Sequence, residues 1–208
     1  HADGMLVSAL DDIAWTLNLR GSDVHCNPVF VSYLLIDTKT TTLFINDEKL
    51  TPDVKAYLTA QGVQTAPYNH IKDALRNYDE YNILLDPNVI SYTLFKQVRT
   101  QEIVRASSPI PAMKAIKNEI EVEGFRRAMI RDGVALVKFL RWLQTAVTKG
   151  QETEISVAEK LTALRAEQPL FRGISFDTIA GYEAHGAIVH YEATLETDAP
   201  LKPHGFLL

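Results

Sequence analysis

The sequence is poor in cysteine and contains no long apolar run. Its single cysteine, Cys26, cannot form an internal disulfide, which suits a reducing compartment. No apolar stretch approaches the roughly 20 residues that a membrane-spanning helix needs, and the N-terminus lacks a signal-peptide pattern. Cys-x-x-Cys pairs, glycine-rich phosphate loops, internal repeats and low-complexity tracts are also missing. We therefore predict a cytoplasmic protein with no membrane partner.

Clustered positive charge is also lacking. The 21 Lys and Arg residues are dispersed among 26 Asp and Glu residues, and the formal net charge is −5. A surface that binds nucleic acid needs a basic stripe, so we expect no nucleic-acid partner. Hydrophobic residues make up 46% of the 208 positions, enough for a substantial core in one or two domains.

Both ends of the chain run into strand-like sequence. The chain begins with His1 rather than Met, an apolar run follows at residues 5–10, and the last three residues are Phe206, Leu207 and Leu208. Natural termini are usually polar and loosely held. We therefore predict that this sequence is a piece of a longer protein.

The first half alternates strand-like and helix-like segments. The candidate strands lie at residues 5–10, 29–36, 41–45, 63–66, 82–85 and 102–105. Those at residues 29–36 and 41–45 are rich in β-branched and aromatic residues. The candidate helices lie at residues 13–17, 52–61, 71–77 and 89–98. This alternation predicts an α/β unit, a mixed sheet flanked by helices.

Several residues mark the ends of these segments. Asp11 or Asp12 is expected to cap the first helix. Thr51 is expected to cap the second, with Pro52 at its first position. The prolines at residues 109 and 111 place the end of the α/β unit near residue 110, because the residue before a proline disfavours helix.

A long periodic segment follows at residues 118–149. Its apolar stripe consists of Val122, Phe125, Met129, Gly133, Leu136, Leu140, Leu143 and Val147. We interpret it as a core helix whose second half, with Phe139 and Trp142 beside the stripe, is the more deeply covered. Gly133 costs about 1 kcal/mol against alanine, which suggests close packing there. Thr153 or Ser156 is expected to begin a further helix that ends near residue 167.

Two short apolar runs near the C-terminus, residues 173–181 and 186–191, have the pattern of strands. Alternation would point His185 and His190 to opposite faces, so they form a poor chelating pair. Because burial of an imidazole requires a polar partner, pattern alone favours His190 as a hydrogen-bonded core or rim residue over a site residue. Similarly, the polar loop at residues 20–23 is better interpreted as a turn in which Asp23 bonds the backbone than as a substrate-facing loop.

The side chains near His190 form an incomplete metal shell. The candidates are Asp177, Glu183, His185 and Glu192. Only Glu192 follows in near register, and a metal site needs several ligands on rigid elements. We therefore predict no metal bound by these residues alone.

Three motifs change this interpretation. The runs SFDTIAG at residues 175–181 and GAIVHY at residues 186–191 resemble the start of the catalytic domain in the aminopeptidase P group. That group belongs to the creatinase/methionine aminopeptidase-like "pita-bread" metallopeptidases. The run ALDDIAWTLNLRGSDV at residues 9–24, continued by NPVF at residues 27–30, is similar to the middle domain of the long, three-domain form. Residues 114–121 and 124–128 are similar to the helix that opens the catalytic domain.

The resemblance implies a fold and a domain arrangement. It predicts a creatinase N-terminal-type α/β (α+β) domain at residues 1–110, with a mixed sheet flanked by helices. Residues 111–208 would be the incomplete beginning of a pita-bread catalytic domain.

The resemblance also implies a role for one residue. His190 matches the family histidine that lies beside the metal pair and hydrogen-bonds the substrate, so it is the predicted catalytic and substrate-binding residue. The family's dinuclear site, usually two Mn²⁺ ions, is held by two aspartates, one histidine and two glutamates. All five follow the strand that carries His190, so this chain is expected to bind no metal and to be inactive by itself. Relatives often have Asn where this chain has His185, which leaves a role for His185 open.

The implied function is that of a metal-dependent Xaa-Pro aminopeptidase, which removes an N-terminal residue when proline follows. The expected partner is a peptide with proline at its second position, and the parent protein is expected to be a homodimer. Two alternatives remain: a non-catalytic pita-bread protein that binds peptides or proteins, and a hydrolase of Xaa-Pro dipeptides or creatine on the same fold.

Overall fold

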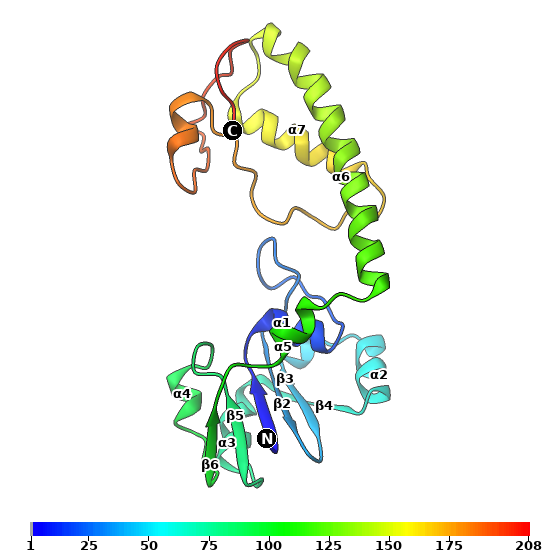
Figure 1. Ribbon diagram of the computed structural model, residues 1–208, viewed down its shortest axis with the longest axis vertical. Helices are drawn as coiled ribbons and strands as arrows, with labels where there is room; N and C mark the ends of the chain where they lie inside the picture. The colour runs from blue at the N-terminus through cyan, green and yellow to red at the C-terminus, as the bar shows by residue number, and fades with distance from the viewer. Residues whose placement is uncertain (1) are drawn as a thin grey trace. The chain divides into compact units, whose positions relative to one another are not determined.

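The computed structural model describes residues 2–208, and the chain divides into two compact units, His1–Ile116 and Lys117–Leu208. Figure 1 shows the elements of each unit. None of the helices among the described residues has both the length and the apolar composition needed to span a bilayer.

The first unit is built on a sheet of six strands. The strands are β1 (Gly4–Val7), β2 (Ser32–Asp37), β3 (Thr41–Ile45), β4 (Val63–Pro67), β5 (Asn82–Leu85) and β6 (Glu102–Arg105). The helices are α1 (Leu10–Thr16), α2 (Pro52–Ala60), α3 (Ile71–Arg76), α4 (Tyr92–Phe95) and α5 (Ile110–Ala115), with 3₁₀ turns η1 (Asp47–Lys49) and η2 (Tyr68–His70). The predicted α/β fold, a mixed sheet flanked by helices, is confirmed.

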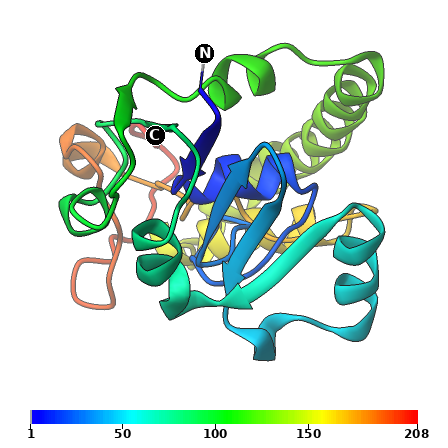
Figure 2. The same ribbon diagram turned by 90° about the horizontal axis from the view of Figure 1, so that it is seen from below.

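The sheet has the order β4-β3-β2-β1-β5-β6. The β1–β2 and β2–β3 pairs are antiparallel, and the other three pairs are parallel. The β2–β3 hairpin, with Leu34 opposite Leu43, is the one that the sequence predicts at residues 29–45. Helices lie on both faces of this sheet (Figures 1 and 2), as the parallel connections require.

Strand alternation separates the apolar side chains into two cores. Leu34 packs with α1 and α2 on one face, whereas its neighbour Leu35 packs with α3 and α4 on the other. In β3, Leu43 and Phe44 divide between the two cores in the same way. This is the two-residue periodicity of an extended chain whose two faces are both covered.

The predicted caps are correct for α2 and wrong for α1. Thr51 accepts the Val54 N–H at 3.3 Å, as expected of an N-cap residue. The N-cap of α1 is Ala9, which forms no side-chain hydrogen bond, while Asp11 and Asp12 lie inside the first turn. Both carboxylates pair with Lys114 of α5 instead, a partner that lies about a hundred residues away in the sequence and that no local rule identifies.

Helix α5 lies where the sequence predicts a boundary between domains. Ile110 begins α5 and Pro111 falls in its first turn, a position that tolerates proline because the N–H there has no intrahelical partner. Ile110 is buried in the first unit's core, so the compact unit extends to Ile116 rather than to residue 110.

The second unit consists of α6 (Glu119–Ala146), η3 (Val147–Lys149), α7 (Glu154–Ala166) and η4 (Glu183–Ala187). Asn118 and Glu121 form a capping box at the start of α6. At the start of α7, Thr153 is the N-cap residue and forms a second capping box with Ser156. Of the two caps that the sequence allows, Thr153 is therefore the correct one. The predicted ends at residues 149 and 167 lie within a few residues of the observed ones.

The apolar stripe predicted for α6 is only partly buried. Phe139 is buried with Trp142, Leu143 and Val147 packed around it, which confirms the deeper cover of the second half. In the first half Phe125 is 58% exposed and Met129 is 68% exposed. The inference of close packing at Gly133 is wrong, because a Cβ atom built there has no heavy-atom neighbour within 4 Å among the described residues.

The strands predicted at residues 173–181 and 186–191 are not formed. The backbone has positive φ at Gly173 (147°), Glu183 (51°) and His190 (55°), and η4 occupies residues Glu183–Ala187. The isolated Tyr182–Leu207 bridge lies next to these runs, and no strand is assigned within residues 117–208. An extended segment needs a paired neighbour for its N–H and C=O groups, and this is why the pattern alone misleads.

Candidate functional site

His190 lies in an exposed turn that follows η4. Its φ of 55° is in the left-handed region, where histidine is found more often than most non-glycine residues. No hydrogen bond or ion pair joins its imidazole to another described residue. Pattern alone favours a hydrogen-bonded core or rim histidine, and that expectation is wrong. Both ring nitrogens are instead available to a molecule outside this chain.

The polar centre of the second unit is a buried carboxylate on α7. Glu154 is 0% exposed, and its Oε1 accepts the Tyr182 N–H at 2.6 Å. Its Oε2 accepts the Tyr191 hydroxyl at 2.7 Å and the Ala199 N–H at 3.2 Å. His185 Nδ1 lies 3.0 Å from Oε1 and 3.1 Å from Oε2. We refer to these five residues as the Glu154 cluster.

The chemistry of the cluster fixes the tautomer of His185. An ionised carboxylate only accepts hydrogen bonds, so His185 Nδ1 must carry the proton that faces Glu154. Tyr191 Oη lies 2.8 Å from the same nitrogen, and the two rings are 4.6 Å apart between centroids. Of these two histidines, His185 is the one whose ring is bound to side chains of the second unit.

Hydrogen bonding outweighs burial at Glu154. Burial raises the pKa of this carboxyl, but the bonds from Tyr191, the Tyr182 N–H, His185 and the Ala199 N–H together lower the pKa below the ordinary value of 4.5. At Tyr191, burial and the bond to Glu154 raise the pKa of the phenol. Glu154 is therefore ionised at neutral pH, and the Tyr191 phenol keeps its proton.

Backbone bonds fasten the following segment to the same end of α7. The Glu154 N–H donates to the Ala199 carbonyl at 3.1 Å, and the Leu201 N–H donates to the Glu152 carbonyl at 2.8 Å. Asp198 Oδ1 accepts the Ile155 N–H at 3.0 Å, in the first turn of the helix, where a carboxylate is favourable. Residues 198–201 are thus fixed independently of the Glu154 side chain.

The other predicted candidates around His190, which are Asp177, Glu183 and Glu192, do not all meet in one place. Asp177 and Glu192 line a cavity of about 610 Å³ together with Glu154, and His190 does not line it. Glu183 Oε1 accepts the Phe206 N–H at 3.0 Å, which is a structural role.

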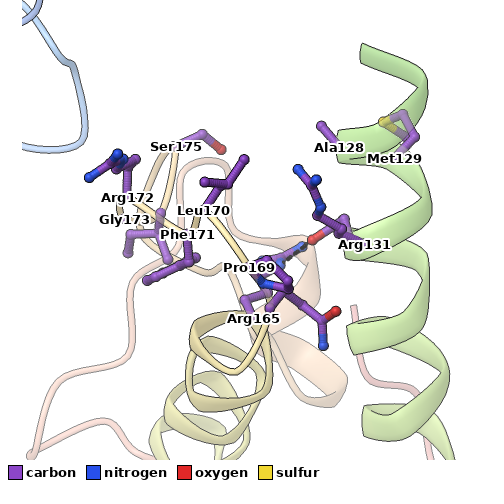
Figure 3. Close-up of a pocket in the computed structure, with 13 residues that line it drawn as sticks. Ala128, Met129, Arg131, Arg165, Pro169, Leu170, Phe171, Arg172, Gly173 and Ser175 are labelled. Carbon is purple, nitrogen blue, oxygen red and sulfur yellow. Dashed lines mark hydrogen bonds and ion pairs between the residues drawn. The ribbon is translucent and has the colours of Figure 1, made fainter. Parts of the chain in front are cut away.

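A second pocket of about 350 Å³ lies between α6 and the segment that follows α7. Figure 3 shows Arg131 and Arg165 on its α6 and α7 sides and Phe171 on the connecting segment. Arg165 pairs with Asp132 through two bonds of 2.6 and 3.3 Å, so part of the positive charge is neutralised. The pocket includes neither His190 nor the Glu154 cluster.

The second unit does not present a metal shell of its own. Within residues 117–208, no three His, Cys, Asp or Glu side chains bring ligand atoms within 4.8 Å of one another. A dinuclear centre needs more oxygen and nitrogen ligands than that, so residues 117–208 do not by themselves fit one.

The loop at residues 20–23 has the structural role that its sequence favours. Asp23 Oδ2 accepts the Val31 N–H at 2.6 Å and pairs with Lys49. The hydrogen bond from Lys49 is the main reason that the pKa of Asp23 is lowered. This confirms the turn interpretation for Asp23.

Sequence reasoning missed Glu154 and Tyr191 as partners. An acidic residue directly after a helix cap is ordinarily explained by the helix dipole, and this explanation needs no tertiary partner. Tyr191 is separated from Glu154 by 37 positions, and the wrong strand assignment placed its ring on a sheet face.

Comparisons with known proteins agree with this architecture. Residues 1–121 match the family described as the creatinase/prolidase N-terminal domain, and residues 123–208 match metallopeptidase family M24. The chain belongs to the creatinase/prolidase N-terminal domain family.

The similar curated proteins are Xaa-Pro aminopeptidases. The chain is 42% identical to Xaa-Pro aminopeptidase 1 of Dictyostelium discoideum over 96% of its own length and 32% of that protein. It is 38% identical to a probable Xaa-Pro aminopeptidase P of Arthroderma benhamiae over 98% of the chain and 31% of that protein. The chain thus spans about a third of the length of these relatives.

Solved structures show the same relationship. The Caenorhabditis elegans X-prolyl aminopeptidase, described as a cytosolic enzyme with a di-nuclear active site, matches with a TM-score of 0.91 at 31% identity. The match covers 97% of this chain and 34% of that one. An Xaa-Pro dipeptidase from Bacillus anthracis matches with a TM-score of 0.70 at 16% identity, over 97% of this chain and 53% of that one. At that identity the likeness concerns the fold alone.

Proposed function

We propose that this chain is part of a metal-dependent Xaa-Pro aminopeptidase, which hydrolyses the bond between an N-terminal residue and a following proline. The observation that carries the proposal is the 42% identity to an Xaa-Pro aminopeptidase over 96% of this chain. The C. elegans enzyme, similar at a TM-score of 0.91, and the match to family M24 support the same conclusion.

In this proposal His190 is the catalytic and substrate-binding residue that the chain supplies. Its imidazole is exposed, has no protein partner among the described residues, and can donate to or accept from a peptide group. A histidine within hydrogen-bond reach of the reacting peptide can also move protons.

The metal centre belongs to the rest of the proposed enzyme. Because residues 117–208 bring no three ligands together, we propose that two Mn²⁺ ions are held by residues that only the longer protein supplies. Such a pair would supply an activated water for amide hydrolysis. The 208-residue chain alone is then expected to be inactive and to bind manganese weakly. We also propose a cytoplasmic, homodimeric parent enzyme that acts on peptides with proline second.

A peptide panel tests the proposal. The protein with the full length of the relatives is assayed on a Xaa-Pro-Xaa peptide, on the matching Xaa-Ala-Xaa peptide, and on the Xaa-Pro dipeptide. Release of the first residue from the proline peptide alone supports the aminopeptidase. Cleavage of the dipeptide alone would indicate a dipeptidase, and binding without cleavage would indicate a non-catalytic peptide-binding protein.

Metal removal completes the test. Chelation should abolish the activity, and Mn²⁺ should restore it better than Zn²⁺, Co²⁺ or Mg²⁺ at equal occupancy. The isolated 208-residue chain serves as the matched control, and calorimetry with Mn²⁺ should detect no sub-micromolar site in it. Activity that survives complete metal removal would contradict the proposal.

A further inference from the structure

We propose that Glu154 is a positioning residue for His190. Its buried carboxylate accepts hydrogen bonds from both sides of the loop at residues 182–199, which carries the imidazole. This inference rests on the proposed function, since it concerns the orientation of the residue assigned to the substrate. It adds a residue on α7, 36 positions before His190 in the sequence, to that machinery.

The loop is held by one side chain from both of its ends. Before His190, Tyr182 and His185 donate to Glu154 through the bonds described above. After His190, the Tyr191 hydroxyl and the Ala199 N–H donate to the same carboxylate. Glu154 is thus the common acceptor for groups on either side of an exposed turn.

The tie next to His190 is the most direct. Tyr191 is the adjacent residue, is only 8% exposed, and is bound to both Glu154 and His185. With the tyrosine ring fixed, the backbone of His190, whose φ is 55°, sets the direction in which its side chain leaves the loop. Non-glycine residues rarely occupy this region without support from their surroundings. The cluster provides that support.

Only a carboxylate fits this position. All the groups that face Glu154 are donors: two backbone N–H groups, a phenol and Nδ1–H. A carboxylate has two oxygens that can accept all of these bonds, whereas the amide of glutamine would turn two N–H donors toward them. The Glu154→Gln substitution keeps the shape, removes half of the acceptors, and leaves buried donors unpaired.

The Glu154 cluster is separate from the apolar core that packs α6 against α7. Helices α6 and α7 pack through an apolar core that includes Phe139, Val157 and Leu161, and residues 198–201 keep their backbone bonds to α7. Loss of the carboxylate should therefore release the loop without unfolding the helix pair. This distinguishes a positioning role from a merely structural one.

A double-mutant cycle in the full-length enzyme tests the coupling. Glu154→Gln should lower kcat/KM on the Xaa-Pro peptide by about 10–100-fold, since a misplacement of about 1 Å can cost about 10²-fold. In a His190→Ala background the same substitution should change kcat/KM by less than about threefold, because the two residues act in series. Glu159→Gln is the matched control on the exposed side of α7 and should stay within about twofold of wild type.

Hydrogen exchange on the 208-residue chain tests the same idea without any activity. In Glu154→Gln, amides of residues 183–192 should exchange at least about tenfold faster than in Glu159→Gln, while amides in the middle of α6 and α7 keep their rates. Tyr191→Phe should produce a smaller change of the same kind, because it removes one of the bonds.

The outcomes separate the two proposals. Additive losses in the cycle, unchanged exchange in the loop, or equally faster exchange throughout α6 and α7 would each overturn the positioning role. A full-length wild-type protein that cleaves no Xaa-Pro peptide would overturn the proposed function, whatever the exchange rates show. Non-additive kinetics together with local loosening of the loop would support both.

Discussion

The two units bury their apolar side chains in different ways. In the first, Leu34, Leu43 and Ile83 are completely buried, because each face of the six-stranded sheet packs against helices. In the second, a long helix packs against one shorter helix, and Ile120 (84%), Ile130 (69%) and Val137 (68%) remain exposed. A sheet with two covered faces buries successive residues, whereas a helix pair buries only one stripe.

Polar contacts compensate in the second unit for the missing sheet. The 42 residues after α7 contain no assigned strand, yet Tyr182, Tyr191 and Ala199 are all fastened to Glu154. Apolar packing is non-directional, so it does not by itself aim a loop. Hydrogen bonds to a buried carboxylate are directional and specify one arrangement. We therefore infer that apolar packing stabilises the first unit, whereas the hydrogen bonds of the Glu154 cluster fix the geometry of the loop in the second unit.

The largest contrast is expected from leucine truncation. Leu34→Ala, at a position 0% exposed in the first unit, should lower the free energy of unfolding by about 2–5 kcal/mol. Leu140→Ala, at a position 56% exposed on α6, should change it by less than about 0.5 kcal/mol. Denaturant titration of the 208-residue chain measures both. Equal losses would show that the face of α6 is covered in solution and would break the comparison.

Glycine substitutions should act in opposite directions in the two units. A Cβ atom at Gly21 would lie 2.7 Å from Phe30 Cβ and 2.9 Å from the Val29 carbonyl oxygen, so Gly21→Ala should cost about 1–3 kcal/mol. At Gly133 the added methyl group meets nothing within 4 Å, and Gly133→Ala should stabilise α6 by about 1 kcal/mol through helix propensity. Thermal unfolding followed by circular dichroism compares them. A lower melting temperature for Gly133→Ala would mean that α6 has a close neighbour there.

A smaller effect concerns pH and sharpens the role assigned to Glu154. Because its folded pKa is lowered below 4.5, the carboxylate contributes stability that is present above pH 4.5 and is lost as the pH falls through the folded pKa. Glu154→Gln should therefore flatten the acid-side slope of stability below about pH 4.5, whereas Glu159→Gln should leave the slope unchanged.

Fluorescence can follow the second unit alone in this experiment. The chain has two tryptophans, Trp15 in the first unit and Trp142 in the second, so Trp15→Phe leaves one reporter beside the α6–α7 core. Identical acid slopes for the Glu154→Gln and Glu159→Gln variants in this background would contradict the assignment of an ionised, hydrogen-bonded Glu154.

The sequence predicts what depends on local chemistry. Thr51 with Pro52, and Thr153, mark helix starts through rules that need no tertiary information, and the structure has helices there. The β2–β3 hairpin follows from β-branched runs on either side of a short polar connection. These local signals account for most of the first unit.

The sequence does not predict contacts between residues that lie far apart along the chain. Asp12 meets Lys114, and Glu154 meets Tyr191, although nothing near any of these residues specifies the pairing. The GAIVHY run has strand-like composition, but it finds no neighbouring strand within residues 117–208 and forms a turn instead. Helix periodicity likewise gives the stripe on α6 without showing which part of it is covered.

The central claim, that this chain supplies His190 to an Xaa-Pro aminopeptidase, is tested most directly by one substitution. His190→Ala in the full-length enzyme is compared with wild type on the same Xaa-Pro peptide, with metal content measured in each sample. We predict that kcat/KM falls by about 10²–10⁴-fold, the usual contribution of a general acid–base histidine, while metal content is unchanged. Activity within about threefold of wild type, or loss of the bound metal, would contradict the account.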